Sequence, residues 1–278
     1  LRALRERVTE AANYFRQQGF DIQAYNTMES AHDVDDVRKA LGVEKLNLVG
    51  FSYGTHLGLA CIRYHGENLN RVTLVGTEGP DHTNKLPFTS DASLKRLAQL
   101  AAAAPELEGK VPDLFGMLRD VLNRLEKEPV TVQITDQRSK KPVEVKVGKS
   151  GLQFLIMRDL GDTNDLPIFP AWFYTMYHND YSILARFVER RYNQFSQGIS
   201  LMTAVMDASS GTTKARIAKI EDEAKTALLG NMVNFPFPGI DDAVGSPDLG
   251  DKFRSPINTN VPTLFISGTL DNNTPPFQ

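Results

Sequence analysis

Apolar residues near the start of the chain recur at steps of three and four positions, the period of an amphipathic helix. This first stripe ends near Gly19 and is expected to pack one face on a sheet; it comprises Leu1, Leu4, Val8, Ala11 and Phe15. A second helix is predicted from a cap at Asn26 to a stop at Gly42.

Strand-like and helix-like patterns then alternate. Residues 46–49 form a short apolar run, a glycine-bounded turn follows, a helix is predicted to about His65, and residues 72–75 form a second strand. Alternation of this kind predicts parallel strands joined by right-handed crossovers. Ligands then bind beyond the carboxyl ends of the strands.

The next run of the same character is 262–268. Because a crossover between parallel strands needs only about a dozen residues, the long intervening stretch indicates an insertion. It is predicted to be mainly helical, with one β-hairpin formed by residues 130–134 and 143–147. We therefore expect core segments at 1–83 and 256–278 and a cap domain at 84–255.

The composition narrows the classes of protein. The 278 residues are 41% hydrophobic and carry a formal net charge of −3, with acids and bases mixed along the chain, so a nucleic-acid partner is not expected. No stretch approaches the ~18 apolar residues of a spanning helix. The single Cys61 excludes an internal disulfide and a cysteine metal site. No metal or cofactor is expected, and the sequence assigns no compartment; a secreted or periplasmic location stays open.

Ser52 is the strongest candidate for chemistry. It lies in the turn Gly50-Phe51-Ser52-Tyr53-Gly54, directly between the predicted strand and helix. A serine raised on so tight a turn exposes its hydroxyl as a nucleophile, and the backbone N–H of Tyr53 would be one oxyanion donor. The competing interpretation is that Ser52 only caps the following helix.

A nucleophilic serine also needs an acid and a base. Asp271 follows the strand-like run near residue 266 and is the predicted acid, against the alternative of an ordinary turn aspartate. In this chain order the histidine comes last, so we expect one more strand and then the histidine, about 20 to 35 residues beyond Asp271. The five histidines present are His32, His56, His65, His82 and His178, of which only His82 is predicted at the correct edge of the sheet.

Two stretches resemble the proline iminopeptidase and tripeptidyl aminopeptidase group of α/β-hydrolases. They are residues 25–55, with Asp35-Asp36-Val37-Arg38-Lys39-Ala40-Leu41-Gly42 and the Ser52 turn, and residues 262–276, ending in Asp271-Asn272-Asn273-Thr274-Pro275-Pro276. The resemblance implies an α/β-hydrolase fold, a mostly parallel sheet with helices on both faces and a large, mainly helical cap insertion. It also implies a cofactor-free exopeptidase that forms an acyl-serine intermediate, with Ser52 as nucleophile and Asp271 as acid.

The resemblance further suggests ligands for a substrate amine. Relatives often carry a Cys-Ala-acid motif in the cap, and the equivalent here is Val205-Met206-Asp207, which makes Asp207 a candidate. Glu78, beyond the second strand, is another candidate, with a solvated loop acid as the alternative. Cap aromatics could wall an apolar pocket or form plain core; they are Trp172, Phe173, Tyr174 and Tyr177.

Three functions remain open at this point. The first is a serine exopeptidase acting on a short peptide or another small acyl substrate. The second is a carboxylic ester hydrolase, because the same triad cleaves esters. The third is an inactive, ligand-binding protein of the same fold.

Overall fold

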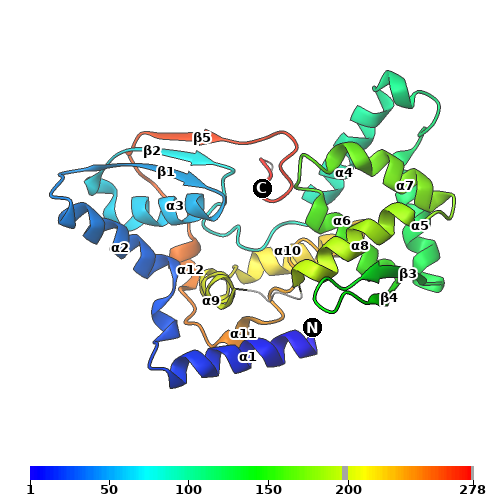
Figure 1. Ribbon diagram of the computed structural model, residues 1–278. Coiled ribbons are helices and arrows are strands. Elements are labelled where there is room, and N and C mark those ends of the chain that lie inside the picture. Colours follow the sequence, from blue (N-terminus) through cyan, green and yellow to red (C-terminus); the bar gives the residue numbers. More distant parts are fainter. Residues whose placement is uncertain (196–199, 277–278) are drawn as a thin grey trace. The chain divides into compact units, whose positions relative to one another are not determined.

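The computed structural model of the chain describes residues 1–195 and 200–276 (Figure 1). Its contacts divide the chain into two compact units. The first unit comprises Leu1–Leu86, Ser200–Asp222 and Asn234–Gln278, and the second comprises Pro87–Ile199 and Glu223–Val233.

A parallel sheet organises the first unit. Its described strands are β1 (Leu46–Phe51), β2 (Leu69–Val75) and β5 (Thr263–Ile266), in the order β1-β2-β5. Both pairings are parallel, with Gly50 opposite Leu74 and Leu74 opposite Phe265. The predicted α/β alternation with parallel strands is therefore confirmed, and the carboxyl ends of the three strands meet at one edge.

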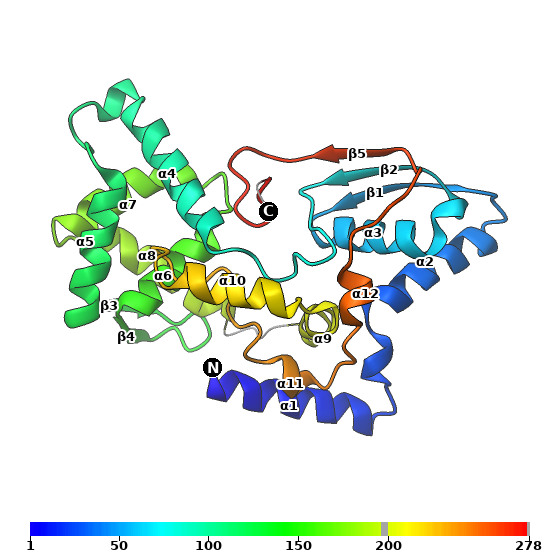
Figure 2. The ribbon, with the colours of Figure 1, turned by 180° about the vertical axis from the view of Figure 1, so that it is seen from behind.

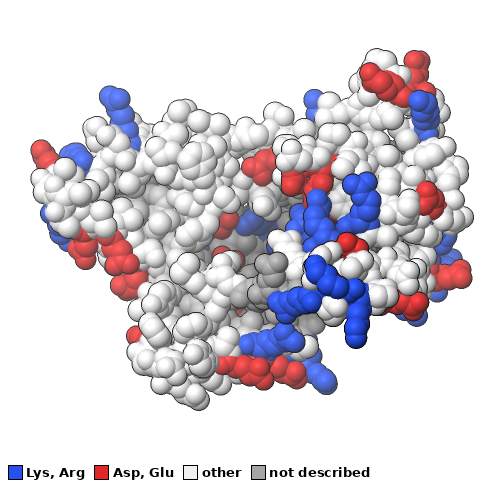
Figure 3. Space-filling view, in the orientation of Figure 1, with Lys and Arg blue, Asp and Glu red and all other residues white. Residues whose placement is uncertain are grey.

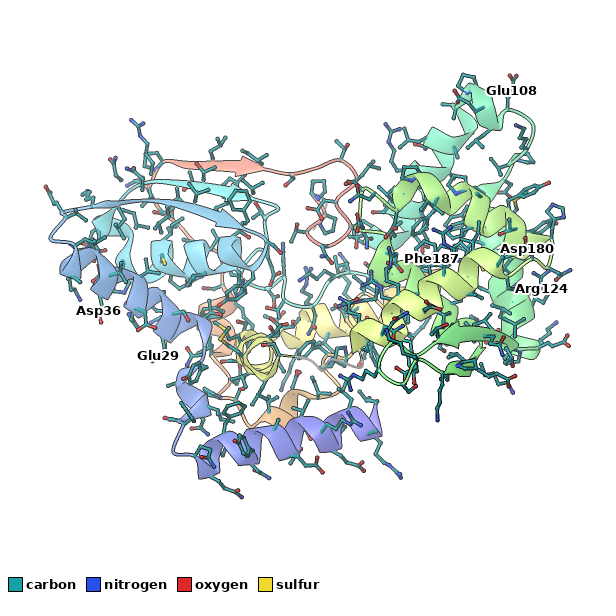
Figure 4. All side chains as sticks on the ribbon, viewed as in Figure 1. Glu29, Asp36, Glu108, Arg124, Asp180 and Phe187 are labelled. Carbon is teal, nitrogen blue, oxygen red and sulfur yellow. The ribbon has the colours of Figure 1, made fainter. Side chains whose placement is uncertain are left out.

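Helices α2 (Thr27–Ala40) and α3 (Tyr53–His65) lie on one face of this sheet, with a 3-10 turn, η2 (Gly66–Asn68), leading into β2 (Figure 1). The core on this face is made mainly by small and branched side chains, together with Phe253: Ala31, Leu59, Ala60, Cys61, Ile62, Leu69, Val72 and Leu74. Asp36 and Glu29 lie on the outer side of α2, away from the strands (Figure 4). The Cys61 thiol is buried in this core, and burial raises its pKa to about 11.

The opposite face of the sheet carries apolar side chains that are exposed, so among the described residues the helices expected on both faces are found on one face only. The register aligns Val49 with Thr73 and Leu264, and aligns Phe51 with Val75 and Ile266. Relative exposure is 65% for Val49, 66% for Phe51 and 57% for Leu264. The surface over the sheet, at the upper left of Figure 3, carries few charged side chains.

The first helix, α1 (Arg2–Gln17), packs elsewhere than predicted. Its apolar stripe lies against α9 (Leu201–Ser210) and α11 (Asp241–Val244), as Figure 2 shows for α11, and the shared core includes Val8, Ala204, Val205, Ile240 and Val244. The expectation that α1 packs on the sheet is wrong, because periodicity gives the apolar face of a helix but not the surface that covers it. The first unit also contains η1 (Ile22–Ala24), α12 (Gly250–Arg254) and most of α10 (Lys214–Ala224).

The second unit is mainly helical, as predicted. Its helices are α4 (Phe88–Ala102), α5 (Leu114–Lys127), α6 (Lys149–Asp159), α7 (Phe169–Tyr177) and α8 (Ser182–Phe195), with 3-10 turns η3 (Pro105–Leu107) and η4 (Leu166–Ile168). The predicted hairpin is confirmed as the antiparallel pair β3 (Val130–Thr135) and β4 (Pro142–Val147).

Aromatic side chains fill the core of the second unit. Trp172 stacks on Phe187 at 3.9 Å between ring centroids, and Phe173 packs against both Phe169 and Trp172. Relative exposure is 0% for Trp172 and 1% for Phe173. These two aromatics are therefore part of the core of the second unit, whereas Tyr174 and Tyr177 are 39% and 37% exposed.

The division by contacts differs from the predicted segments. Residues 200–222 and 234–255 fall in the unit that contains the sheet, whereas the expected cap was 84–255. The assignment of a cap domain to 84–255 stays a prediction. In the part of the chain that the structure describes, no helix is long and apolar enough to cross a membrane.

Candidate active site

Ser52 occupies a strained turn between β1 and α3. Its backbone has φ 50° and ψ −123°, a combination that costs a residue other than glycine about 1–3 kcal/mol. Three hydrogen bonds hold this backbone: the Ser52 N–H donates to Val75 O at 3.0 Å, and Ser52 O accepts from Thr55 N at 2.8 Å and from Thr55 Oγ1 at 2.6 Å. The Ser52 side chain is exposed and makes no capping bond to α3. The helix-cap interpretation therefore does not describe this serine.

Gly50 makes the tight turn sterically feasible. A Cβ at Gly50 would lie 2.3 Å from Gly54 O, so any side chain here would force strand and helix apart. A Cβ at Gly54 would meet nothing within 4 Å. Of the two flanking glycines, only Gly50 is required by this close approach.

Asp271 lies in the turn that follows β5. Its Oδ1 accepts from Asn273 N at 2.9 Å and from Thr274 N at 2.8 Å, and its Oδ2 accepts from Thr274 Oγ1 at 2.6 Å. These bonds fix the carboxylate and leave it lone pairs for a further donor.

Gly76, at the end of β2, lies between Ser52 and Asp271. It has φ +66°, and a Cβ there would lie 3.4 Å from Asp271 Oδ2 and 3.9 Å from Ser52 N. The structure thus brings the two predicted residues to one place, although most of the sequence lies between them. A glycine directly after the second strand was the signal for this close approach.

None of the five histidine rings is hydrogen-bonded to Ser52 or Asp271 within residues 1–195 and 200–276. The buried His56 bonds Gly79 O and Ser210 Oγ. Burial and then the Arg216 charge lower the pKa of His82 to about 4, and its ring lies against Gly79. His82 is therefore not placed as the base in this structure. The other three lie elsewhere: His32 and His65 bond each other, and His178 packs on Tyr174.

The Tyr53 backbone N–H is the first of α3, and the first amides of a helix have no acceptor within it. It is therefore free to serve as an oxyanion donor. The Tyr53 phenol is largely buried, and its pKa is raised to about 12, first by burial and then by the nearby carboxylates of Asp207 and Glu78.

The two predicted amine ligands differ in their partners. Glu78 is buried and already forms an ion pair, with Lys85 Nζ 2.9 Å from its Oε2. Asp207 forms no ion pair in the described part of the chain, and burial, followed by the Glu78 charge, raises its pKa to about 7. Of the two, Asp207 is the carboxylate that an incoming cation could still neutralise.

Sequence reasoning missed a third carboxyl group, that of Asp241. Burial raises its pKa to about 7, and the charges of Asp242 and Asp207 act in the same direction. Its Oδ1 is buried without a hydrogen-bond partner among the described residues. Nothing in the local sequence around Asp241 marks it, because only the packing of α11 near α9 brings it close to Asp207.

The parallel sheet with a serine turn between strand and helix defines the α/β-hydrolase fold, and the family model described as "alpha/beta hydrolase fold" matches residues 9–115. The predicted fold class is confirmed. Similar proteins include the tripeptidyl aminopeptidases of Streptomyces lividans and Streptomyces coelicolor, each 35% identical over 80 residues. The aligned stretch covers 29% of this chain and 12% of each relative, so it spans a small part of their length. These matches confirm the resemblance and support a hydrolase.

Proposed function

We propose that the protein is a serine hydrolase that releases residues from the N-termini of short peptides. The base takes the Ser52 proton as Ser52 Oγ attacks the carbonyl carbon, and the peptide C–N bond then breaks as the amine leaves with that proton; water hydrolyses the resulting acyl-serine. The Tyr53 N–H stabilises the oxyanion, and Asp271 orients the base. The observation that supports this most directly is the strained, exposed and uncapped Ser52 with Asp271 beside it. The histidine base is assigned to a position after Asp271, as the chain order of the fold requires.

The exopeptidase part of the proposal depends on Asp207. A buried ammonium without a partner costs several kcal/mol, so a free N-terminus needs a carboxylate. Asp207 has no ion pair in the described structure, and an ammonium beside it would favour its ionised form. Glu78 is paired with Lys85 and plays the lesser part.

Covalent labelling tests the nucleophile. In protein expressed from the complete reading frame, Ser52→Ala is expected to abolish labelling by a fluorophosphonate probe and to lower turnover by about a million-fold. Ser139→Ala, which changes an exposed serine near the β3–β4 turn, is the matched control and should label normally. Undiminished labelling of the Ser52→Ala protein would overturn the assignment.

Substrate comparison separates the peptidase from a carboxylic ester hydrolase. The pairing of Glu78 with Lys85 favours the ester hydrolase, because it leaves one carboxylate fewer to bind a substrate amine. Alanine 4-nitroanilide should be cleaved much faster than its N-acetyl derivative, and Asp207→Asn should reduce that preference. Equal rates on both, with faster cleavage of 4-nitrophenyl butyrate, would assign the ester hydrolase. Absence of all three activities and of labelling would leave the binding-protein hypothesis.

A further inference from the structure

Four side chains of the first unit form a continuous chain of hydrogen bonds. Tyr53 Oη lies 3.1 Å from Thr27 Oγ1, which lies 3.1 Å from Ser210 Oγ. Ser210 Oγ lies 3.1 Å from His56 Nε2, and His56 Nδ1 lies 3.1 Å from Gly79 O. Relative exposure is 0% for Thr27, 1% for Ser210 and 2% for His56, so water does not compete for these bonds.

The carbonyl at one end fixes the direction of every bond. Because Gly79 O can only accept, His56 Nδ1 must carry the proton, and the Nε2 of a neutral ring is then an acceptor. Ser210 therefore donates to His56, and its oxygen accepts from Thr27. Thr27 has then used its only proton, so Tyr53 donates to Thr27.

This arrangement requires a neutral His56. Burial lowers the pKa of His56; the Glu78 charge and the hydrogen bond to Gly79 O oppose this, and the Lys85 charge reinforces it. If Nε2 were also protonated, its N–H and the Ser210 O–H would point at each other. The Ser210 hydroxyl would then have to rotate and accept, which would reverse the direction of the other hydrogen bonds. Since both ring nitrogens are used, His56 is not available as a base.

The hydrogen-bonded chain connects the Ser52 turn with the end of α9, where Asp207 lies. Tyr53 and His56 lie in the first turns of α3, directly after Ser52. Ser210 ends α9, one turn beyond Asp207. The end of α9 is also held by Arg254, whose Nε donates to Ser210 O at 2.8 Å.

We propose that the hydrogen-bonded chain of Tyr53, Thr27, Ser210 and His56 is a positioning device that fixes α9, and with it Asp207, relative to the Ser52 turn. The inference rests on the proposed function, in which Ser52 attacks the peptide and Asp207 holds its amine. A substrate that contacts both must span the distance between them. The chain therefore sets which peptide bond reaches Ser52.

Ser210→Ala tests this role, with Ser209→Ala as the matched control. Both serines are buried on α9, but the Ser209 hydroxyl has no partner among the described residues. Because a misplacement of about 1 Å can cost on the order of 100-fold in rate, Ser210→Ala should reduce kcat/KM on alanine 4-nitroanilide by roughly that factor. Fluorophosphonate labelling and 4-nitrophenyl butyrate cleavage should change little, and Ser209→Ala should resemble the wild type throughout.

A second substitution, at Thr27, separates loss of positioning from misfolding. Thr27→Val removes the hydroxyl at the middle of the chain while keeping the shape, and should give the same selective loss; Thr27→Ser should restore activity. The positioning role would be overturned if Ser210→Ala and Thr27→Val lowered anilide cleavage, ester cleavage and fluorophosphonate labelling equally. It would also be overturned if both variants kept the full rate on the anilide.

A spectroscopic readout separates this inference from the proposed function. Nitrogen-15 NMR of His56 should show a protonated Nδ1 and a bare Nε2, whether or not the protein is a peptidase. A proton on Nε2 would overturn the chain itself. Wild-type protein that shows this tautomer but neither labels nor cleaves would instead refute the proposed function.

Discussion

Gly50 is the residue on which the Ser52 turn depends most directly. Gly50→Ala places a Cβ 2.3 Å from Gly54 O, a backbone atom that cannot move aside cheaply. We expect a loss of about 1–3 kcal/mol in the free energy of unfolding, as for other overpacked sites. The measurement is chemical denaturation.

Gly54→Ala is the matched control for this prediction. Its Cβ meets nothing within 4 Å, and alanine is favoured over glycine inside a helix by about 1 kcal/mol. Stability should therefore stay the same or rise. Equal losses in the two variants would contradict the steric account of the turn.

Asp207 should make stability depend on pH. An unfolded aspartate has a pKa of about 3.9, whereas burial and Glu78 raise the pKa of folded Asp207 to about 7. Between these values the folded protein binds more protons than the unfolded protein, so this group makes stability fall as the pH rises.

Asp207→Asn removes that titration and should stabilise the protein at pH 8 by about 4 kcal/mol, since the pKa is raised by about three units and each unit is worth about 1.4 kcal/mol. At pH 5 the wild-type carboxyl is largely neutral in the folded state, so the gain should be smaller. Denaturation at both pH values measures this, with the exposed Asp33→Asn as control. A gain at pH 5 as large as at pH 8 would contradict the raised pKa.

Helix α2 owes its start to a side-chain cap that the sequence predicts. Asn26 Oδ1 accepts from Glu29 N at 3.0 Å, and its Nδ2 donates to Gln23 O at 3.0 Å. Asn26→Ala should lower the free energy of unfolding by about 1–2 kcal/mol. In the second unit, Asp113 caps α5 through Gly116 N at 2.8 Å, so Asp113→Ala provides a comparison of the same kind. Melting curves that do not move for Asn26→Ala would show that the cap is redundant.

The exposed face of the sheet has a consequence for the whole molecule. Parallel sheets are normally covered on both faces, and contiguous exposed apolar surface favours association. The 278-residue chain expressed alone should therefore bind an apolar dye and self-associate. The double variant Val49→Thr/Leu264→Thr should reduce dye binding and self-association severalfold. Its free energy of unfolding should be nearly unchanged, because these side chains are 65% and 57% exposed.

Dye fluorescence and light scattering measure this effect. Leu74→Thr is the contrasting variant, because Leu74 is fully buried in the core under α3 and its loss should destabilise the fold. If the double variant binds dye as strongly as the wild type, the exposed apolar surface lies elsewhere.

Local patterns determined much of this protein. The strand of residues 46–49, the Asn26 cap, the hairpin at 130–134 and 143–147, and the Ser52 turn could all be predicted, because each depends on residues within a few positions of one another. The order of strand, serine turn and helix also predicts the fold, because it too is a local feature of the sequence.

Tertiary structure decided what depends on residues far apart in the sequence. It placed α1 against α9 and α11 rather than on the sheet, and it buried Trp172 and Phe173. The bonds that join His56 to Ser210 and Thr27 to Ser210 also come from separate helices. Periodicity tells which face of a helix is apolar, but only packing decides which partner covers it and which buried polar groups meet there.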